Sequence, residues 1–300
     1  MPRTASSVRA EPTARLAELQ RQRPEWQVWL RLLDLSTRAV NDEGWRTPLD
    51  ETELSTLNTG PGGPPLLHGL TLHLSASRVG QLVRRLAAAA SEGEVKSGIS
   101  LREYQPSAAE ALHLVSAAVR QAADEIRLLA LERGIDEGAL ASLAHLASLP
   151  VLQSCGQMLE QRIPAYWQYG YCPVCAAWPT IAERRGLDRS RRLRCGRCAA
   201  AWEVEWLYCI YCGERDHRQL ASLEPDQQGE MLKVETCATC KGYLKSIATL
   251  QGFTALELLL QDLETVELDL VALNREYVRP VKSAFTLNVH LADHASRRDL

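Results

Sequence analysis

Apolar residues in the first half of the chain recur at helical spacing. In "EWQVWLRLLDL" (25–35), which follows Pro24, they are separated by three and four residues. This is the period of one helix face, and proline is tolerated at a helix start. A further helix is expected over 75–90, after a stretch rich in glycine and proline (58–69) that predicts a loop. The first residues, 1–22, are expected to form a flexible tail.

Two signals mark the helices that follow. Ser107 and Glu110 fit a capping box, in which each side chain satisfies a backbone N–H at the helix start. Four apolar residues then follow near helical spacing: Leu112, Val115, Val119 and Ile126. A last pair of helices is expected over 137–149 and 151–162, because Pro150 lacks the backbone donor that a helix interior needs.

The pattern changes at residue 166. Short strand-like runs alternate with Cys-x-x-Cys turns up to residue 250, and after Gly252 the stretch "TALELLLQDLETVELDLVALNREY" is again helical in pattern. The sequence therefore predicts an α+β protein: an all-helical N-terminal domain, two tandem rubredoxin-like or zinc-ribbon-like modules, and a C-terminal helix with a tail that packs on the rest. The expected divisions are 1–22 (tail), 23–165 (helices), 166–250 (modules) and 251–300 (C-terminal helix and tail).

Composition narrows the class of protein. The chain is 46% hydrophobic and 24% charged with a net charge of −3, which favours neither nucleic acid nor a membrane surface as partner. The N-terminus shows no apolar signal segment, and no uninterrupted apolar run approaches 18 residues. We therefore expect a cytoplasmic protein without membrane insertion, whose cysteines are reduced and available to bind metal.

Cysteine carries the strongest chemical signal. Residues 1–154 contain none, and after Cys155 there are four Cys-x-x-Cys pairs. Each pair can place two thiolates on one face of a tight turn, and two turns complete a tetrahedral site. Gaps of 19, 10 and 24 residues separate successive pairs. The longer gaps have room for two strands and a return, so we expect each to lie within one site. The predicted sites are Cys172, Cys175, Cys195 and Cys198, and Cys209, Cys212, Cys237 and Cys240.

The short gap then predicts a connecting strand between the modules. Trp202, Val204, Trp206 and Tyr208 alternate with Glu203 and Glu205, as on a strand with one buried face. Zn²⁺ and rubredoxin-type iron are the natural occupants of four-thiolate sites. Such sites have no open position for a substrate, so we expect two structural metal ions. A thioredoxin-like dithiol is disfavoured, because that motif occurs singly beside a βαβ unit.

Other residues offer weaker candidates. The arginine-rich stretch 183–197 could contact an anion, a protein or nucleic acid. Residues 166–250 hold 12 basic and 10 acidic side chains, and this near balance disfavours nucleic acid as a partner. Cys155 is expected to be a buried structural thiol. Asp262 and Asp269, seven apart on one helix face, are expected to be solvated or capping rather than catalytic. No nucleophile–base pair, phosphate loop or histidine metal motif stands out, so we expect no enzyme.

The cysteine motifs resemble those of the FdhE-type accessory proteins of formate dehydrogenases. The segments that show this resemblance are "YCPVC" (171–175), "RRLRCGRC" followed by Trp202, "CIYCGE", and "VETCATCKGYLK" with Glu235, Tyr243 and Lys245. The C-terminal helix is similar at Asp262, Leu268, Asp269 and Tyr277, and "PPL" (64–66) matches more weakly. Ala176-Ala177 follows the first pair, where the family more often has Gly-Ser.

The resemblance implies a cytoplasmic accessory protein that binds the catalytic subunit of a respiratory formate dehydrogenase and helps it mature before export. It also implies two rubredoxin-like metal modules, with iron as a candidate beside zinc. The hairpin 184–197 and the strand 198–209 are the first expected docking surfaces. Two alternatives stay open: a zinc-ribbon adaptor for nucleic acid or transcription, and a small rubredoxin-like electron carrier. The sequence gives no oligomeric state.

Overall fold

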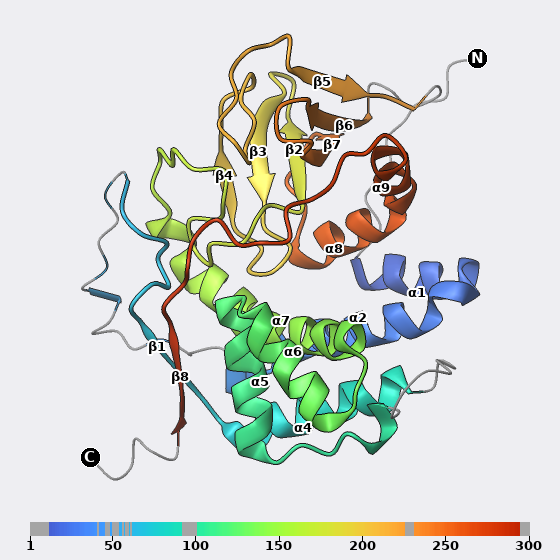
Figure 1. Cartoon of the computed structure of the whole chain (residues 1–300), viewed down its shortest axis with the longest axis vertical. Coiled ribbons are helices and arrows are strands. Elements are labelled where there is room, and N and C mark those ends of the chain that lie inside the picture. Colours follow the sequence, from blue (N-terminus) through green and yellow to red (C-terminus); the bar gives the residue numbers. More distant parts are fainter. Residues whose placement is uncertain are drawn as a thin grey trace.

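The protein has an α+β fold in which a helical half and a sheet half share one core (Figure 1). The computed structural model describes residues 12–40, 42–45, 62–91, 101–225 and 231–294, together with 49, 54, 55, 57 and 60. The helices of the first half are α1 (Pro12–Gln22), α2 (Gln27–Val40), α4 (Ala76–Ala90), α5 (Ala108–Arg120), α6 (Ala123–Arg133) and α7 (Glu137–Leu159).

Helix α7 is the central element of the helical half. It is continuous through Pro150, so the expected pair of helices is wrong. Proline removes one backbone hydrogen bond, but apolar burial around the kink-prone turn compensates, since Leu149, Val151 and Leu152 are fully buried. By length and composition the helical stretch Glu137–Arg162 could cross a membrane, but 72% of its most apolar window is buried inside the protein.

The N-terminal boundaries also differ from expectation. Residues 12–22, expected to belong to a flexible tail, form α1, and its Leu16 and Leu19 are buried. Residues 1–11 lie outside the described part of the chain. The capping box of Ser107 and Glu110 is confirmed. The helix that it starts ends at the left-handed residue Gln121, so α5 and α6 replace a longer helix.

The two cysteine modules form one six-stranded sheet. Its strands are β2 (Ile181–Arg185), β3 (Ser190–Arg194), β4 (Ala201–Glu203), β5 (Leu220–Leu223), β6 (Leu232–Cys237) and β7 (Tyr243–Thr249). The order is β4-β3-β2-β7-β6-β5, so each module contributes an antiparallel three-stranded unit. The units join through the parallel pair β2–β7, in which Ile181 lies opposite Lys245. The two cysteine modules, which the sequence predicts as tandem units, therefore form one continuous sheet.

One face of this sheet packs against two helices. The expected single C-terminal helix is α8 (Ala255–Glu264) followed by α9 (Val266–Leu273), with a break at Thr265. Leu258 of α8 packs with Ile181 and Ile247, and Leu268 of α9 packs in a second small apolar cluster. The following chain returns to the helical half, where β8 (His290–Asp293) pairs in parallel with β1 (Thr71–Leu74) (Figure 1).

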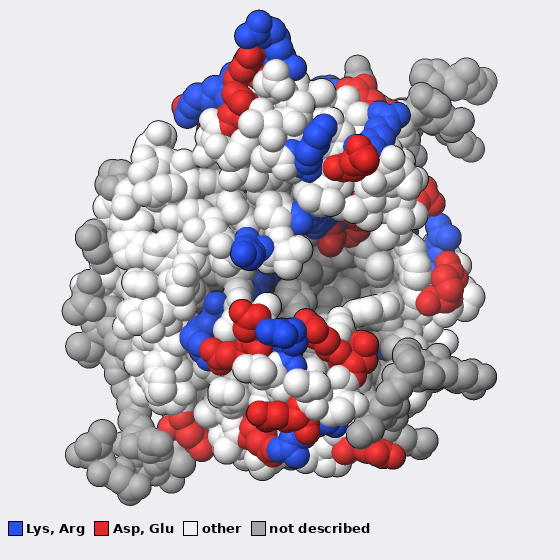
Figure 2. All heavy atoms as spheres, in the orientation of Figure 1, with Lys and Arg blue, Asp and Glu red and all other residues white. Residues whose placement is uncertain are grey.

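Charged side chains of both signs are interspersed on the face of the molecule drawn in Figure 2. Figure 2 shows basic and acidic residues mixed over one face, without a broad patch of a single sign. This distribution fits the net charge of −3. A face that binds the nucleic-acid backbone is typically a basic stripe or patch, and the viewed face has none.

Candidate metal centres

Each Cys-x-x-Cys turn has the same backbone form. The residue directly after the second cysteine is left-handed in all four: Ala176 (φ 62°), Ala199 (62°), Gly213 (78°) and Lys241 (58°). In every turn the N–H of the first cysteine donates to the carbonyl five residues on, as from Cys172 to Ala177. This curl turns both thiols to one side. The left-handed position explains why glycine is common after such a pair, and why alanine is tolerated only with strain.

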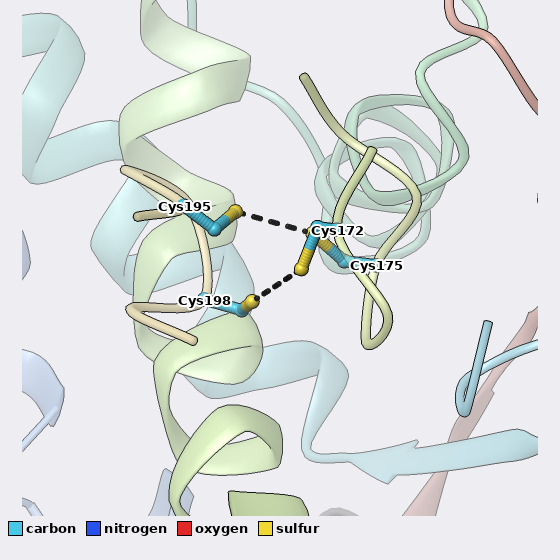
Figure 3. A group of neighbouring side chains, drawn as sticks. All are labelled: Cys172, Cys175, Cys195 and Cys198. Atoms are coloured by element: carbon cyan, nitrogen blue, oxygen red, sulfur yellow. Dashed lines mark hydrogen bonds between the residues drawn. The ribbon is translucent and has the colours of Figure 1, made fainter. Parts of the chain in front are cut away.

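The structure brings the cysteines together in the predicted sets. All sulfurs of Cys172, Cys175, Cys195 and Cys198 lie within 4.8 Å of one another, and so do those of Cys209, Cys212, Cys237 and Cys240. In the first cluster the two pairs face each other from opposite loops (Figure 3), with Cys172–Cys198 and Cys175–Cys195 sulfur distances of 3.4 and 3.5 Å. In the second cluster the corresponding distances are 3.6 and 3.7 Å.

These distances fit a tetrahedral ion and not disulfides. Metal–sulfur bonds of about 2.3 Å place tetrahedral sulfurs about 3.8 Å apart, whereas a disulfide joins them at about 2.05 Å. Two sulfurs also accept backbone hydrogen bonds, from Val174 N–H to Cys172 (3.4 Å) and from Gly242 N–H to Cys240 (3.3 Å). Such bonds favour thiolates. Both clusters are thus able to hold a metal ion, with four soft sulfur donors suited to zinc or iron.

The pKa values of the clustered thiols also favour a bound metal ion. Burial raises the pKa of Cys172 and of Cys198 well above the ordinary thiol value, and neighbouring sulfurs add to the shift. In the second cluster burial raises the pKa of Cys240 to about 11. In each cluster one thiol shifts the other way: although burial opposes it, hydrogen bonds from neighbouring sulfurs and backbone lower the pKa of Cys195 and of Cys237. The thiols of one cluster therefore do not all ionise together without a cation. A divalent cation among them removes this penalty, because coordinated thiols lose their protons.

The two clusters differ in exposure. All four residues of the first are buried, with at most 1% of their surface exposed. In the second, Cys212 is exposed and Cys240 is half-buried. Cys155 on α7 is fully buried and stays outside both clusters, as expected for a structural thiol, and burial raises its pKa. The first site is therefore enclosed in the core, and the second lies at the surface.

Two glycines let the backbone approach the cysteine turns. A Cβ added to Gly156 of α7 would lie 1.9 Å from the carbonyl oxygen of Cys198, and one added to Gly170 would lie 1.9 Å from that of Ile210. These contacts pack α7 against the first cluster and the segment before Cys172 against the second. The first cluster also belongs to the same apolar core as α7.

The arginine-rich hairpin is mostly internal. Arg184, Arg191 and Arg194 are 3%, 3% and 5% exposed, so the expectation of a freely accessible docking hairpin is wrong for them. Arg194 forms a buried ion pair with Glu183, and Arg191 pairs with Glu235 at 2.5 Å. The Arg191–Glu235 pair joins the two modules, because Glu235 lies on β6, whereas the Arg194–Glu183 pair joins two strands of the first module. Both pairs compensate charges that are buried.

The connecting strand is also shorter than expected. Strand β4 ends at Glu203, Trp202 is 3% exposed and Trp206 is 49% exposed, so these tryptophans do not share a buried face. The cause is Arg191, whose guanidinium donates to the carbonyl oxygens of Glu205 (2.8 Å) and Tyr208 (3.4 Å). These side-chain bonds replace the strand ladder and lead the chain away from the sheet.

A buried charge network behind β7 was not expected from the sequence. Lys245, fully buried, contacts Asp262 at 2.7 Å and Asp269 at 2.8 Å. Arg279 contacts the same carboxylates at 3.2 and 2.8 Å, and Tyr243 donates to Asp269. Burial opposes the charge on Arg279, but the two carboxylates outweigh it and raise its pKa. The aspartates are therefore structural partners of the buried Lys245 and the half-buried Arg279, and not capping residues.

The architecture defines a class: a helical region followed by a sheet with two four-cysteine clusters. The family model for the C-terminal domain of FdhE matches residues 207–286. The FdhE homolog of Stutzerimonas stutzeri is 35% identical over 111 residues, which span 36% of this chain and 35% of the relative. That of Aquifex aeolicus is 25% identical over 152 residues, which span 50% of this chain and 53% of the relative.

A solved structure extends the likeness to most of the chain. The FdhE protein from Pseudomonas aeruginosa has a similar fold over 92% of this chain and 94% of its own, with a TM-score of 0.57 and 23% identity. The sequence matches to curated relatives span about a third to a half of their length. Residues 207–286 are thus similar to the C-terminal domain of FdhE, in the part of the chain where the cysteine motifs predict that resemblance.

Proposed function

We propose that this protein is a cytoplasmic, non-enzymatic accessory factor that binds the catalytic subunit of a respiratory formate dehydrogenase and helps it mature. The observation that carries the proposal is the pair of closed four-cysteine clusters in a chain whose residues 207–286 match the C-terminal domain of FdhE. Four sulfurs leave an ion no open position for a substrate, which favours a structural role. The formate dehydrogenase client follows from the family resemblance.

The eight clustered cysteines are the proposed ligands of two ions, one per cluster, iron or zinc. Each ion would link two turns from different segments of the chain. Site formation would therefore supply folding free energy on the order of 10 kcal/mol per site. This is the role that the metals play in the proposal: they hold a binding surface in shape.

Deleting the gene in its native host tests the function. Formate dehydrogenase activity should fall while immunoblots show unchanged synthesis of the catalytic subunit, and wild-type protein supplied in trans should restore activity. An affinity-tagged copy should co-purify the catalytic subunit from cytoplasmic extract. Normal activity in a deletion strain that has no second family member would overturn the proposal.

One observation favours a second candidate, a rubredoxin-like electron carrier. The second cluster reaches the surface at Cys212, and an exposed iron site can exchange electrons with a partner. Protein purified without oxygen should then be coloured and bleach reversibly on reduction. Colourless, zinc-containing protein would exclude this candidate and leave the first.

A further inference from the structure

The second cysteine cluster is held in place differently from the first. All four cysteines of the first cluster belong to the main apolar core, whereas those of the second belong to none of the apolar clusters that the described residues form. The fourth Cys-x-x-Cys turn, residues 237–242, carries two cysteines of the second cluster, Cys237 and Cys240. Thr239 in this turn donates to the carboxylate of Glu214 at 2.8 Å. Further contacts to the turn come from the segment that follows α9.

That segment leaves α9 from a well-defined helix end. Glu276 is left-handed (φ 62°), and the N–H of Tyr277 donates to the carbonyl of Ala272, five residues back, at 3.0 Å. Such a bond beside a left-handed residue is typical of a Schellman motif, which ends a helix and sets the direction of the next residues. Tyr277 also packs on the small apolar cluster that contains Ala272. From here the chain runs across the molecule to β8 (Figure 1).

Residues 277–279, called the strap below, lie against the fourth turn. Val278 pairs with Gly242 in a parallel β-bridge, and its N–H donates to the carbonyl of Lys241 at 2.8 Å. The ammonium group of Lys241 lies 5.5 Å from the centre of the Tyr277 ring, which is within the range of a cation–π contact. Two residues of the strap therefore contact Lys241, the residue directly after Cys240.

Lys241 is the position at which the fourth turn curls. Its backbone is left-handed (φ 58°), and a residue with a side chain keeps this conformation where its surroundings hold it. The N–H of the next residue, Gly242, donates to the sulfur of Cys240 at 3.3 Å. Gly242 also lies against the third turn, since an added Cβ would be 2.5 Å from Tyr211. If Lys241 were released, this N–H would turn away from the sulfur that it supports.

The far end of the strap is anchored in the buried charge network. Arg279 contacts the carboxylates of Asp262 and Asp269, and its guanidinium lies 5.4 Å from the centre of the Tyr243 ring. Tyr243 directly follows the fourth turn, and its hydroxyl donates to Asp269 at 2.9 Å. The strap is therefore fixed at both ends, by the helix end at Tyr277 and by the network at Arg279.

We propose that the strap is a positioning device for the second metal site. Tyr277 and Val278 hold the fourth turn in the shape that directs its sulfurs to the ion, and they thereby set how slowly the ion leaves. At the surface the strap supplies the support that the apolar core supplies to the first cluster. The inference requires an ion in the second cluster and is independent of the formate dehydrogenase client.

Metal-release kinetics test the inference. Full-length protein, purified without oxygen and loaded with Zn²⁺, is mixed with an excess of a chromogenic chelator. Cys237→Ser lacks a ligand of the second cluster and so identifies the release phase that belongs to it. Val278→Pro removes the N–H that Lys241 accepts, and Val281→Pro is the matched control, because Val281 lies beyond the strap and is 96% exposed. Tyr277→Leu removes the ring but keeps an apolar side chain, whereas Tyr277→Phe keeps the ring.

We expect faster release from the second cluster alone. Val278→Pro should accelerate its phase about tenfold, since one hydrogen bond contributes up to roughly that factor. Tyr277→Leu should accelerate it about threefold, which is the size of an exposed cation–π contact. Tyr277→Phe and Val281→Pro should each change it less than about twofold. The phase of the enclosed first cluster should not change in any of these variants.

The two phases separate positioning from general stability. Equal acceleration of both phases would overturn the inference, because a destabilised fold would release both ions. Unchanged release in Tyr277→Leu, or an effect of Val281→Pro as large as that of Val278→Pro, would overturn it too. If Val278→Pro does not fold, the comparison of Tyr277→Leu with Tyr277→Phe decides alone. A wild type with the same Zn²⁺ content as Cys237→Ser would also overturn it, since its second cluster would hold no ion.

Discussion

Replacing Gly156 by alanine should disturb the first cysteine cluster through backbone overlap alone. The added Cβ would lie 1.9 Å from the Cys198 carbonyl oxygen, although ordinary contacts begin near 3.4 Å. The helix or the cysteine turn must therefore move by about 1.5 Å, and no side chain can yield instead. Overpacking of this kind costs about 1–3 kcal/mol, and we expect the upper end because both partners are backbone.

The assay is thermal unfolding together with metal analysis of protein purified without oxygen. A loss of about 3 kcal/mol corresponds to roughly 5–8 °C in melting temperature for a chain of this size. Gly138→Ala on the same helix is the control, since its Cβ would meet the side-chain oxygen of Asp136 at 3.3 Å and no backbone. Alanine favours helices over glycine by about 1 kcal/mol, so this variant should be neutral or stabilising. A Gly156→Ala protein with wild-type melting and full metal content would refute the packing of α7 on this site.

Three further outcomes are expected. Ala176→Gly and Ala199→Gly should each raise the free energy of unfolding by about 0.5 kcal/mol, because relief of left-handed strain exceeds the added chain entropy; denaturant titration showing lower stability would contradict this. Lys245→Ala should lower the free energy of unfolding by about 3 kcal/mol, because Asp262 and Asp269 each lose a cationic partner. The control, Lys282→Ala at an exposed position, should change it little. Equal effects of the two variants in denaturant titration would refute the role of the charge network. A chromogenic chelator should remove one ion per chain in a fast phase, from the site with exposed Cys212; a single phase for both ions would contradict the difference in enclosure.

Local chemistry explains what the sequence predicts well. Two thiols separated by two residues form a turn whatever surrounds them, and the gap lengths decide which turns can meet. The capping box at Ser107 is equally local, since its two partners are three residues apart. The cysteine sets and this helix start are therefore readable from the chain alone.

Long-range pairing explains what the sequence does not show. Arg191 faces Glu235, and Lys245 faces Asp262, across many residues and different elements. Side chains that look like a basic surface are internal for this reason. One signal was available: Lys245 stands inside the apolar strand "YLKSIAT", where a lysine on the covered face needs an acidic partner. Continuity of α7 through Pro150 likewise depends on packing that no local pattern encodes.

The central claim is that each cluster is an independent four-cysteine site. The metal content of two single variants tests this claim most directly. The wild type, purified without oxygen, should contain two ions per chain. Cys195→Ser and Cys237→Ser should each retain one, because each removes a ligand from a different cluster. A folded Cys195→Ser protein that loses ions from both clusters equally would contradict the account.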